Sequence, residues 1–174
     1  METFEAIATK LDVRRYANTA VPEEVKRKTL EAGRLTGSGI NAQHWRFVLV
    51  DDPERLQVLA ANSTSGGWAA AADFAVIVAT SPQYDFASLD AGRAVQAMQL
   101  AAWDEGVVSG IFTGVDQEAM RRDFGIPSDL EVSAVATFGY PERRVMGRKR
   151  RLPLEEVAFR NRFGNRFEAE RADG

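Results

Sequence analysis

The chain of 174 residues contains no cysteine and a single histidine, His44. The missing cysteines exclude disulfides, thiolate nucleophiles, iron–sulfur clusters and cysteine-based zinc sites. One histidine cannot build a histidine-based metal site unaided, and no carboxylate cluster has the spacing of a metal-binding loop. If the protein is an enzyme, its own side chains supply little reactive chemistry, and a cofactor is the expected agent.

Motifs of several common catalytic and nucleotide-binding sites are also missing. The sequence has no G-x-S-x-G nucleophile elbow, no G-x-G-x-x-G fingerprint and no G-x-x-x-x-G-K-[ST] phosphate loop. A Ser-His-Asp site is therefore not expected. Neither a Rossmann fingerprint nor a P-loop explains a phosphate ligand.

Long apolar runs and a strong excess of one charge are absent as well. The N-terminal stretch METFEAIATKLDVRRY has no apolar signal-peptide region, and no run approaches the length of a membrane span. The net charge of −3 gives the molecule as a whole no attraction to nucleic acid or to an anionic membrane. We expect a cytoplasmic protein that binds neither.

The remaining composition is that of an ordinary globular domain. Hydrophobic residues make up 45% of the chain, which is enough for a core, and neither a low-complexity tract nor a linker divides it. There are no internal repeats. We therefore expect a single domain over residues 1–174.

Hydrophobic patterning predicts helices interspersed with strands. The expected helices cover 2–10, the stretch from Pro22 to about Gly33, 53–61, 87–105, 116–126, and a short segment from Leu154. The expected strands cover 45–50, 72–79, 107–115 and 131–141. The continuous apolar run at 72–79 indicates a strand at the centre of the sheet, covered on both faces. Hairpin signals are scarce, which favours an α+β or α/β sheet covered by helices.

Two stretches in the first third of the chain could bind a ligand, and each also has a purely structural interpretation. The stretch 10–16, KLDVRRY, contains three cations that could grip a phosphate or simply favour a helix C-terminus. The stretch 38–43, SGINAQ, is rich in glycine and amide side chains directly before a buried strand. It could wrap a polar, uncharged ligand, or it could be a loop that caps itself.

Two later stretches leave the same choice open. Gly110 and Gly114 could let a flat ring lie against a strand, or they could mark a bulge. Residues 143–151 contain six cations, which could clamp a phosphate or form a solvated surface. No aromatic residues interleave these cations and no reading motif accompanies them, so nucleic-acid binding is not expected.

The order of these stretches resembles the nitroreductase family of FMN-dependent oxidoreductases, from about residue 4 to 163. The R-R-S-x-R-x-F element of that family is similar to KLDVRRY at 10–16, and its P-S-x-x-N-x-Q-P-W-x-F element is similar to GSGINAQHWRF at 37–47. A strand flanked by glycine at 107–114 and a strand ending in GYP at 139–141 follow in the same order. The closing K/R-x-R-x-P-L-x-E-V element is similar to KRRLPLEEV at 149–157.

The resemblance implies a three-layer α+β fold, with helices flanking a mostly antiparallel sheet, and a domain-swapped homodimer that binds FMN at the subunit interface. The C-terminal tail, about residues 159–174, would pack on the partner subunit. By the same resemblance, the residues that would bind FMN are Lys10, Leu11, Asp12, Arg14, Ser38, Gly39, Asn41, Gln43, Asp90, Thr113, Gly114, Lys149 and Arg151.

The implied roles divide this set into three groups. The four cations would hold the phosphate and the nearby ring edge. The four residues between 38 and 43 would reach from the partner subunit to the ribityl chain and the pyrimidine edge of the flavin. Thr113 and Gly114 would lie beside the ring, with a backbone N–H near flavin N5.

The implied activity is a ping-pong reaction, in which hydride passes from NADH or NADPH to flavin N5 and then to a small acceptor such as a nitroaromatic or a quinone. Arg14 would stabilise the anionic reduced flavin, and no side-chain acid or base is assigned. The alternatives are an FMN-binding sensor or sequestering module, a specialised flavoenzyme of the same fold without NAD(P)H-nitroreductase turnover, and a protein that binds a polyanion through residues 143–151.

Several residues depart from the pattern of the family. Lys10 and Leu11 stand at its first and second arginines, Asp12 at its serine, and His44 at a position where proline is common. A carboxylate beside a phosphate is unfavourable. We therefore expect Asp12 to point away from the phosphate, to offer only its backbone, or to neutralise an arginine.

Overall fold

The structure is a computed structural model that describes residues 2–167, and its centre is a four-stranded sheet. The strands are β1 (Arg46–Val50), β2 (Phe74–Thr80), β3 (Val108–Phe112) and β4 (Glu131–Gly139). Their order is β1-β2-β4-β3, and every neighbouring pair is antiparallel. This confirms the α+β class and the antiparallel sheet that the family resemblance implies.

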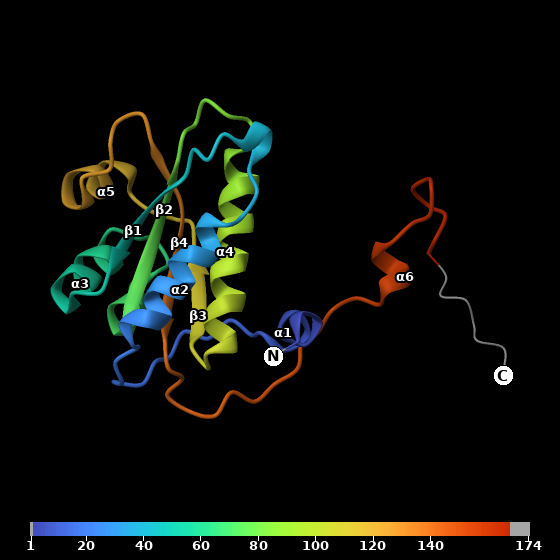
Figure 1. Cartoon of the computed structure of the whole chain (residues 1–174), viewed down its shortest axis with the longest axis horizontal. Helices are drawn as coiled ribbons and strands as arrows, with labels where there is room; N and C mark the ends of the chain where they lie inside the picture. Colours follow the sequence, from blue (N-terminus) through green and yellow to red (C-terminus); the bar gives the residue numbers. More distant parts are fainter. Residues whose placement is uncertain (1, 168–174) are drawn as a thin grey trace.

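Helices cover both faces of this sheet and make three layers (Figure 1). On one face lie α2 (Glu23–Arg34) and α4 (Ala87–Asp104), which also pack against each other. On the other lie α3 (Pro53–Ala61), the short 3-10 helix η2 (Gly67–Ala71) and α5 (Gln117–Phe124). Among the described residues, no helix is long and apolar enough to cross a membrane.

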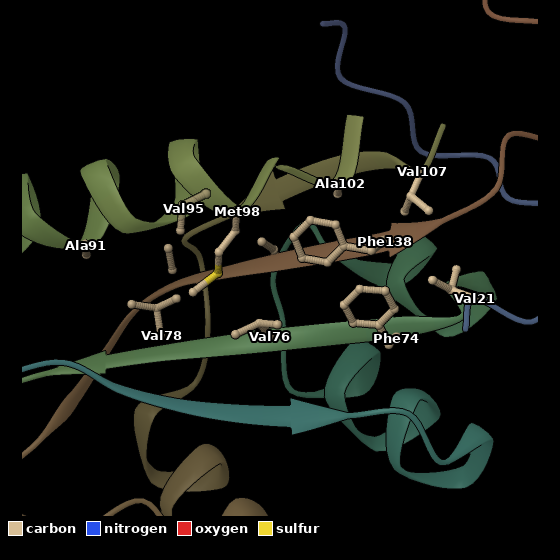
Figure 2. Close-up of a cluster of buried hydrophobic side chains, with 12 residues drawn as sticks. Val21, Phe74, Val76, Val78, Ala91, Val95, Met98, Ala102, Val107 and Phe138 are labelled. Atoms are coloured by element: carbon tan, nitrogen blue, oxygen red, sulfur yellow. The ribbon is translucent and has the colours of Figure 1, made fainter. Parts of the chain in front are cut away.

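Strand β2 supplies residues to the cores on both sides of the sheet. All seven of its residues are buried, which confirms the prediction of a central strand covered on both faces. Its alternate side chains Phe74, Val76 and Val78 face α4, as Figure 2 shows, and the residues between them face α3 and α5. The ring of Phe74 stacks on that of Phe138 from β4, with the ring centres 4.8 Å apart.

The close contact between α2 and α4 depends on a glycine. A Cβ atom at Gly33 would lie 2.1 Å from Cε of Met98, whose side chain is fully buried. A side chain at this point of the helix pair would therefore force the end of the buried Met98 side chain to move. The predicted end of α2 near Gly33 is also confirmed, since the helix runs to Arg34.

The N-terminal segment after α1 (Thr3–Thr9) runs beside the sheet edge at β3. Asp12 pairs with Ser109 in a parallel bridge, and the N–H of Val13 donates to the carbonyl of Ser109 at 2.8 Å. The segment is fixed further along by Tyr16, whose hydroxyl lies 2.7 Å from Oγ1 of Thr137. Burial raises the pKa of the Tyr16 phenol well above its ordinary value, so this hydroxyl stays protonated and holds the segment in place.

The chain after β4 leaves the three layers. It passes beneath α1 and continues to α6 (Leu154–Val157), which lies apart from the sheet and its helices (Figure 1). Large apolar side chains in this part are exposed, among them Leu152, Leu154, Val157 and Phe163. Of the tail expected to pack on a partner, 159–167 lie within the described structure and 168–174 lie outside it.

Two sequence-based boundaries differ from the structure. The strand predicted over 107–115 ends at Phe112, because its pairing with β4 stops there and the carbonyl of Gly114 accepts the N–H of Thr64 instead, at 3.0 Å. Residues 62–68 lie outside every predicted helix and strand, but the chain enters η2 at Gly67. There the indole N–H of Trp68 donates to the carbonyl of Ser65 at 2.9 Å, which closes a turn.

Candidate functional site

Residues from both ends of the chain line one strongly cationic cleft of about 470 Å³. Of the predicted cofactor ligands, it contains five, Lys10, Leu11, Asp12, Lys149 and Arg151. The remaining lining residues are Gln96, Arg148 and Arg150. Five cations therefore face a single carboxylate, an imbalance that suits an anion such as a phosphate.

Lys10 and Asp12 form an ion pair at the wall of this cleft. The Lys10 side chain is only 8% exposed, and its ammonium lies 2.7 Å from Oδ1 of Asp12, whose side chain is 54% exposed. The same oxygen accepts a hydrogen bond from Nε2 of Gln99 at 3.2 Å. Asp12 therefore neutralises a cation, as one of the three expectations held, but its partner is a lysine and not an arginine.

Lys149 closes the cleft from the C-terminal side. Its ammonium donates to the backbone carbonyl of Ile7 in α1. Desolvation by burial lowers the pKa of this ammonium, the nearby charges of Arg151 and Lys10 lower it further, and Asp12 opposes them. An anion bound in the cleft, in addition to the Asp12 carboxylate, would reduce this repulsion between cations.

Arg14 lies outside the cleft. Its guanidinium carbon is 5.1 Å from the ring centre of Trp68, the geometry of a cation–π contact. The Trp68 ring also lies against Gly110, where a Cβ atom would come within 2.7 Å of it, and meets the Phe112 ring edge-on. The glycine at 110 therefore admits a tryptophan of this chain, which sequence reasoning did not foresee.

Thr113 and Gly114 lie just past the end of β3. The Thr113 side chain is exposed, and a Cβ atom at Gly114 would lie 2.1 Å from Oγ1 of Thr64. From Ser109, beside Asp12, to Phe112 the strand extends about 10 Å at the usual rise per residue, and the pair follows directly. The edge strand β3 thus runs from the cationic cleft to the pair expected beside the flavin ring.

The loop 38–43 lies at the N-terminal end of α4. Its backbone is unusual, because Ile40, Asn41 and Gln43 all have positive φ, at 47°, 57° and 47°. The side chains of Asn41 and Gln43 are exposed. None of the residues 38–43 is among those that line the cleft. Within one chain, therefore, the structure does not join this loop to the cationic cleft.

Asp90 anchors that loop from the first turn of α4. The carboxylate is 1% exposed, and its Oδ2 accepts the N–H of Gly39 at 2.9 Å and lies 3.2 Å from Nε2 of His44. Oδ1 accepts from Arg93 at 3.3 Å. The structure thus places Asp90 beneath the loop as an internal acceptor.

Comparison with known proteins identifies the group to which this chain belongs. The model of the nitroreductase family matches residues 7–72 and 58–140. The chain belongs to the nitroreductase family. A relative from Archaeoglobus fulgidus, which carries the name NADH dehydrogenase/NAD(P)H nitroreductase, is 30% identical over 150 residues, covering 81% of this chain and 86% of that protein.

Solved structures show the same fold for this nitroreductase-family chain. A protein from Bacteroides thetaiotaomicron, also named for NADH dehydrogenase/NAD(P)H nitroreductase, superposes with a TM-score of 0.83 at 26% identity, over 92% of this chain and 97% of that one. An FMN-dependent nitroreductase from Clostridium difficile superposes with a TM-score of 0.85 at 22% identity, over 92% and 100%.

Several residues at the candidate site were not singled out from the sequence. Arg148 and Arg150 belong to the basic run 143–151, but nothing in that run distinguished the cleft residues from Arg143 and Arg144. Trp68 carried no signal, because its contacts with Arg14, Gly110 and Phe112 come from distant parts of the chain. Among the described residues, no group of three or more acidic or histidine side chains is placed to hold a metal ion.

Proposed function

We propose that this chain is an FMN-dependent oxidoreductase, which takes electrons from NADH or NADPH and reduces a small acceptor such as a nitroaromatic or a quinone. The observation that carries the proposal is the cationic cleft built by Lys10, Lys149 and Arg151. The names of the relatives support it, since one is FMN-dependent and another is named for NAD(P)H. A cytoplasmic location stays a prediction.

The charge of the cleft suits the phosphate of FMN. A phosphate dianion would leave the surrounding cations in excess even after Asp12 is counted, and charge-assisted hydrogen bonds to phosphate are the strong kind. Lys10, Lys149 and Arg151 would hold it, with Arg148 and Arg150 at the rim. Leu11 would contribute its backbone and its apolar contact to the wall.

The rest of the cofactor would follow β3 and meet a second copy of the chain. Thr113 and Gly114 would lie beside the flavin ring, and Arg14, stacked on Trp68, would place a positive charge near it. The exposed amides of Asn41 and Gln43, with Ser38 and Gly39, would reach the cofactor from the loop of the other copy. This arrangement explains why the loop and the cleft are separate within one chain.

FMN, when bound, supplies the two-electron redox chemistry. The contribution of this chain is to bind and orient the cofactor, and to stabilise negative charge on it with Arg14. Among the described residues we assign no catalytic acid or base. A ping-pong order follows if donor and acceptor use the same exposed face in turn.

The dimer can be tested separately through the segment that leaves the body of the protein. The exposed apolar side chains of residues 152–163 need a partner surface, and we propose that a second copy provides it. Sedimentation of the full chain should show a dimer, and a chain shortened to residues 1–153 should sediment as a folded monomer. A shortened chain that remains fully dimeric would contradict the role of this segment.

The decisive experiment is an absorption spectrum of the purified protein with FMN added, followed by NADH and then NADPH under anaerobic conditions. Flavin bands that bleach would support the oxidoreductase and identify its donor. Bands that persist with both donors would favour an FMN-binding module or a flavoenzyme with another reductant. A protein that takes up no FMN would overturn the proposal.

A further inference from the structure

The loop 38–43 holds a backbone conformation that its residues rarely adopt. Ile40, Asn41 and Gln43 have φ values of 47°, 57° and 47°, in the left-handed region. Isoleucine is β-branched and is particularly disfavoured there. Such a conformation persists only where the surrounding structure imposes it. Contacts outside these three residues must therefore hold the loop in shape.

The strongest of these contacts converge on one carboxylate. Oδ2 of Asp90 accepts the N–H of Gly39, at the start of the loop, at 2.9 Å. The same atom lies 3.2 Å from Nε2 of His44, directly after the end of the loop. Asp90 is 1% exposed and belongs to the first turn of an 18-residue helix, where the helix dipole favours a negative charge. One rigid, buried group therefore joins both ends of the loop.

His44 lies between Asp90 and two aromatic rings. Its side chain is 3% exposed and packs against the rings of Tyr84 and Phe86, with centres 5.0 and 5.8 Å away. Nε2 has Asp90 as its partner, whereas Nδ1 is buried without a hydrogen-bond partner in the described structure. A buried nitrogen without a partner is unfavourable. The ring nevertheless takes the orientation that satisfies Asp90.

Two further contacts complete the support. The N–H of Gln43 donates to Oγ of Ser38 at 2.9 Å, which ties the ends of the loop to each other. A Cβ atom at Gly39 would lie 2.7 Å from the ring of Phe86, so the loop rests directly on that ring. The side chains of Asn41 and Gln43 are exposed to solvent on this backbone, and the amide of Gln43 also donates to the carbonyl of Asn41 at 3.4 Å.

We infer that Asp90 and His44 are positioning residues, which hold the loop 38–43 in the one conformation that presents its polar groups to the cofactor. They act through the backbone of Gly39 and the end of the loop. Because the loop is a proposed contact of FMN, this inference rests on the proposed function. It assigns Asp90 a place beneath the binding surface.

The test compares three variants of the full chain. Asp90→Leu has similar size and no acceptor, whereas Asp90→Asn keeps an oxygen for the Gly39 N–H. The matched control is Asp52→Leu, which removes a carboxylate that accepts a backbone N–H, from Arg55 at 2.9 Å, at the far end of β1. The first measurement is FMN affinity by quenching of flavin fluorescence. The second is hydrogen exchange of the Gly39 amide without FMN.

The expected result is that Asp90→Leu weakens FMN binding about tenfold or more and speeds exchange of the Gly39 amide by a similar factor. Asp90→Asn should restore both to within about threefold of the parent. Asp52→Leu should lower thermal stability, but it should change neither the FMN affinity nor the exchange rate of the Gly39 amide. An Asp90→Leu protein with parental FMN affinity and parental Gly39 exchange would overturn the inference, as would an Asp90→Asn protein as defective as Asp90→Leu.

The exchange measurement separates this inference from the proposed function. If the parent protein binds no FMN, the proposed function fails. Hydrogen exchange of the Gly39 amide in the variants then still shows whether Asp90 protects that amide. If Asp90→Leu does not fold, His44→Phe takes its place, because it keeps an aromatic ring against Tyr84 and Phe86 and removes the bond to Asp90. Parental affinity and parental Gly39 exchange in His44→Phe would then overturn the role of the pair.

Discussion

The ammonium of Lys10 lies 2.7 Å from the carboxylate of Asp12, inside the cleft where an anion is expected to bind. A phosphate entering the cleft must therefore compete with an acid that already engages one of its ligands. Gln99 keeps that acid in place through a hydrogen bond of 3.2 Å. The ion pair should therefore weaken the affinity of the cleft for phosphate. Asp12 stands where the nitroreductase motif has serine.

Replacing this acid should strengthen cofactor binding. In Asp12→Ser, Lys10 loses its internal partner and the cleft loses the one carboxylate among its described lining residues, so FMN affinity should rise about three- to tenfold. Titration calorimetry with FMN measures the change, and Asp12→Asn, which removes the charge and keeps the shape, is the matched variant. Weaker binding in both variants would instead mean that Asp12 holds Lys10 in its binding position.

Removing two cations from the other side of the cleft should have the opposite effect. The double variant Lys149→Ala with Arg151→Ala loses two charge-assisted contacts, so FMN affinity should fall about 100-fold or more. The control is Arg143→Ala with Arg144→Ala, which removes the same charge from the same basic run but does not touch the cleft. Both proteins should keep the far-UV circular dichroism of the parent. Equal losses of FMN affinity in the two double variants would indicate that these cations attract FMN only through their overall charge, and not through specific contacts in the cleft.

The charge of Lys149 should make phosphate binding sensitive to alkaline pH. Burial and the neighbouring cations lower the pKa of Lys149 below the ordinary lysine value of 10.5. Only the protonated ammonium attracts phosphate, so its contribution is complete below the lowered pKa and disappears as pH rises through it. FMN affinity should therefore decline at a lower pH than ordinary lysines titrate.

The variant Lys149→Arg isolates this effect, because arginine keeps its charge throughout the range. Fluorescence titrations at a series of pH values should show a flatter profile for Lys149→Arg than for the parent. Identical profiles would assign the pH dependence to another group.

The elements of this fold are largely predictable because their signals are local. The apolar run at 72–79 marked the central strand, and Pro22 and Gly33 bounded α2 to within a residue or two. The cations at the two ends of the chain could be assigned to one site only through the family resemblance. Their own sequence positions contain no information on distance in space.

The parts that escaped prediction depend on contacts between distant residues. The bond between His44 and Asp90 joins residues 46 positions apart, and the sequence around neither residue predicts it. Arg14 stacks on Trp68, which lies in the 3-10 helix η2, outside every helix and strand predicted from the sequence. Asp12 had three possible roles from sequence. Its pairing with Lys10 was decided by the path of the segment along β3.

A prediction about stability concerns the helix pair that supports the loop. Gly33→Ala places a methyl group in the space of Met98, and the resulting overpacking should lower the free energy of unfolding by about 1–2 kcal/mol, even after the better helix propensity of alanine is counted. Combining it with Met98→Ala should cost less than the sum of the two changes by at least about 0.5 kcal/mol. Urea unfolding of the three variants measures this coupling. Strict additivity would show that the clash is relieved elsewhere.

The contact between Lys149 and Ile7 also bears on the stability of the folded chain. It joins residues 142 positions apart, so the two sides of the cleft come together only when both ends of the chain are in place. A ligand that bridges the two sides therefore binds the folded state and not the unfolded one, and its binding energy adds to the free energy of unfolding.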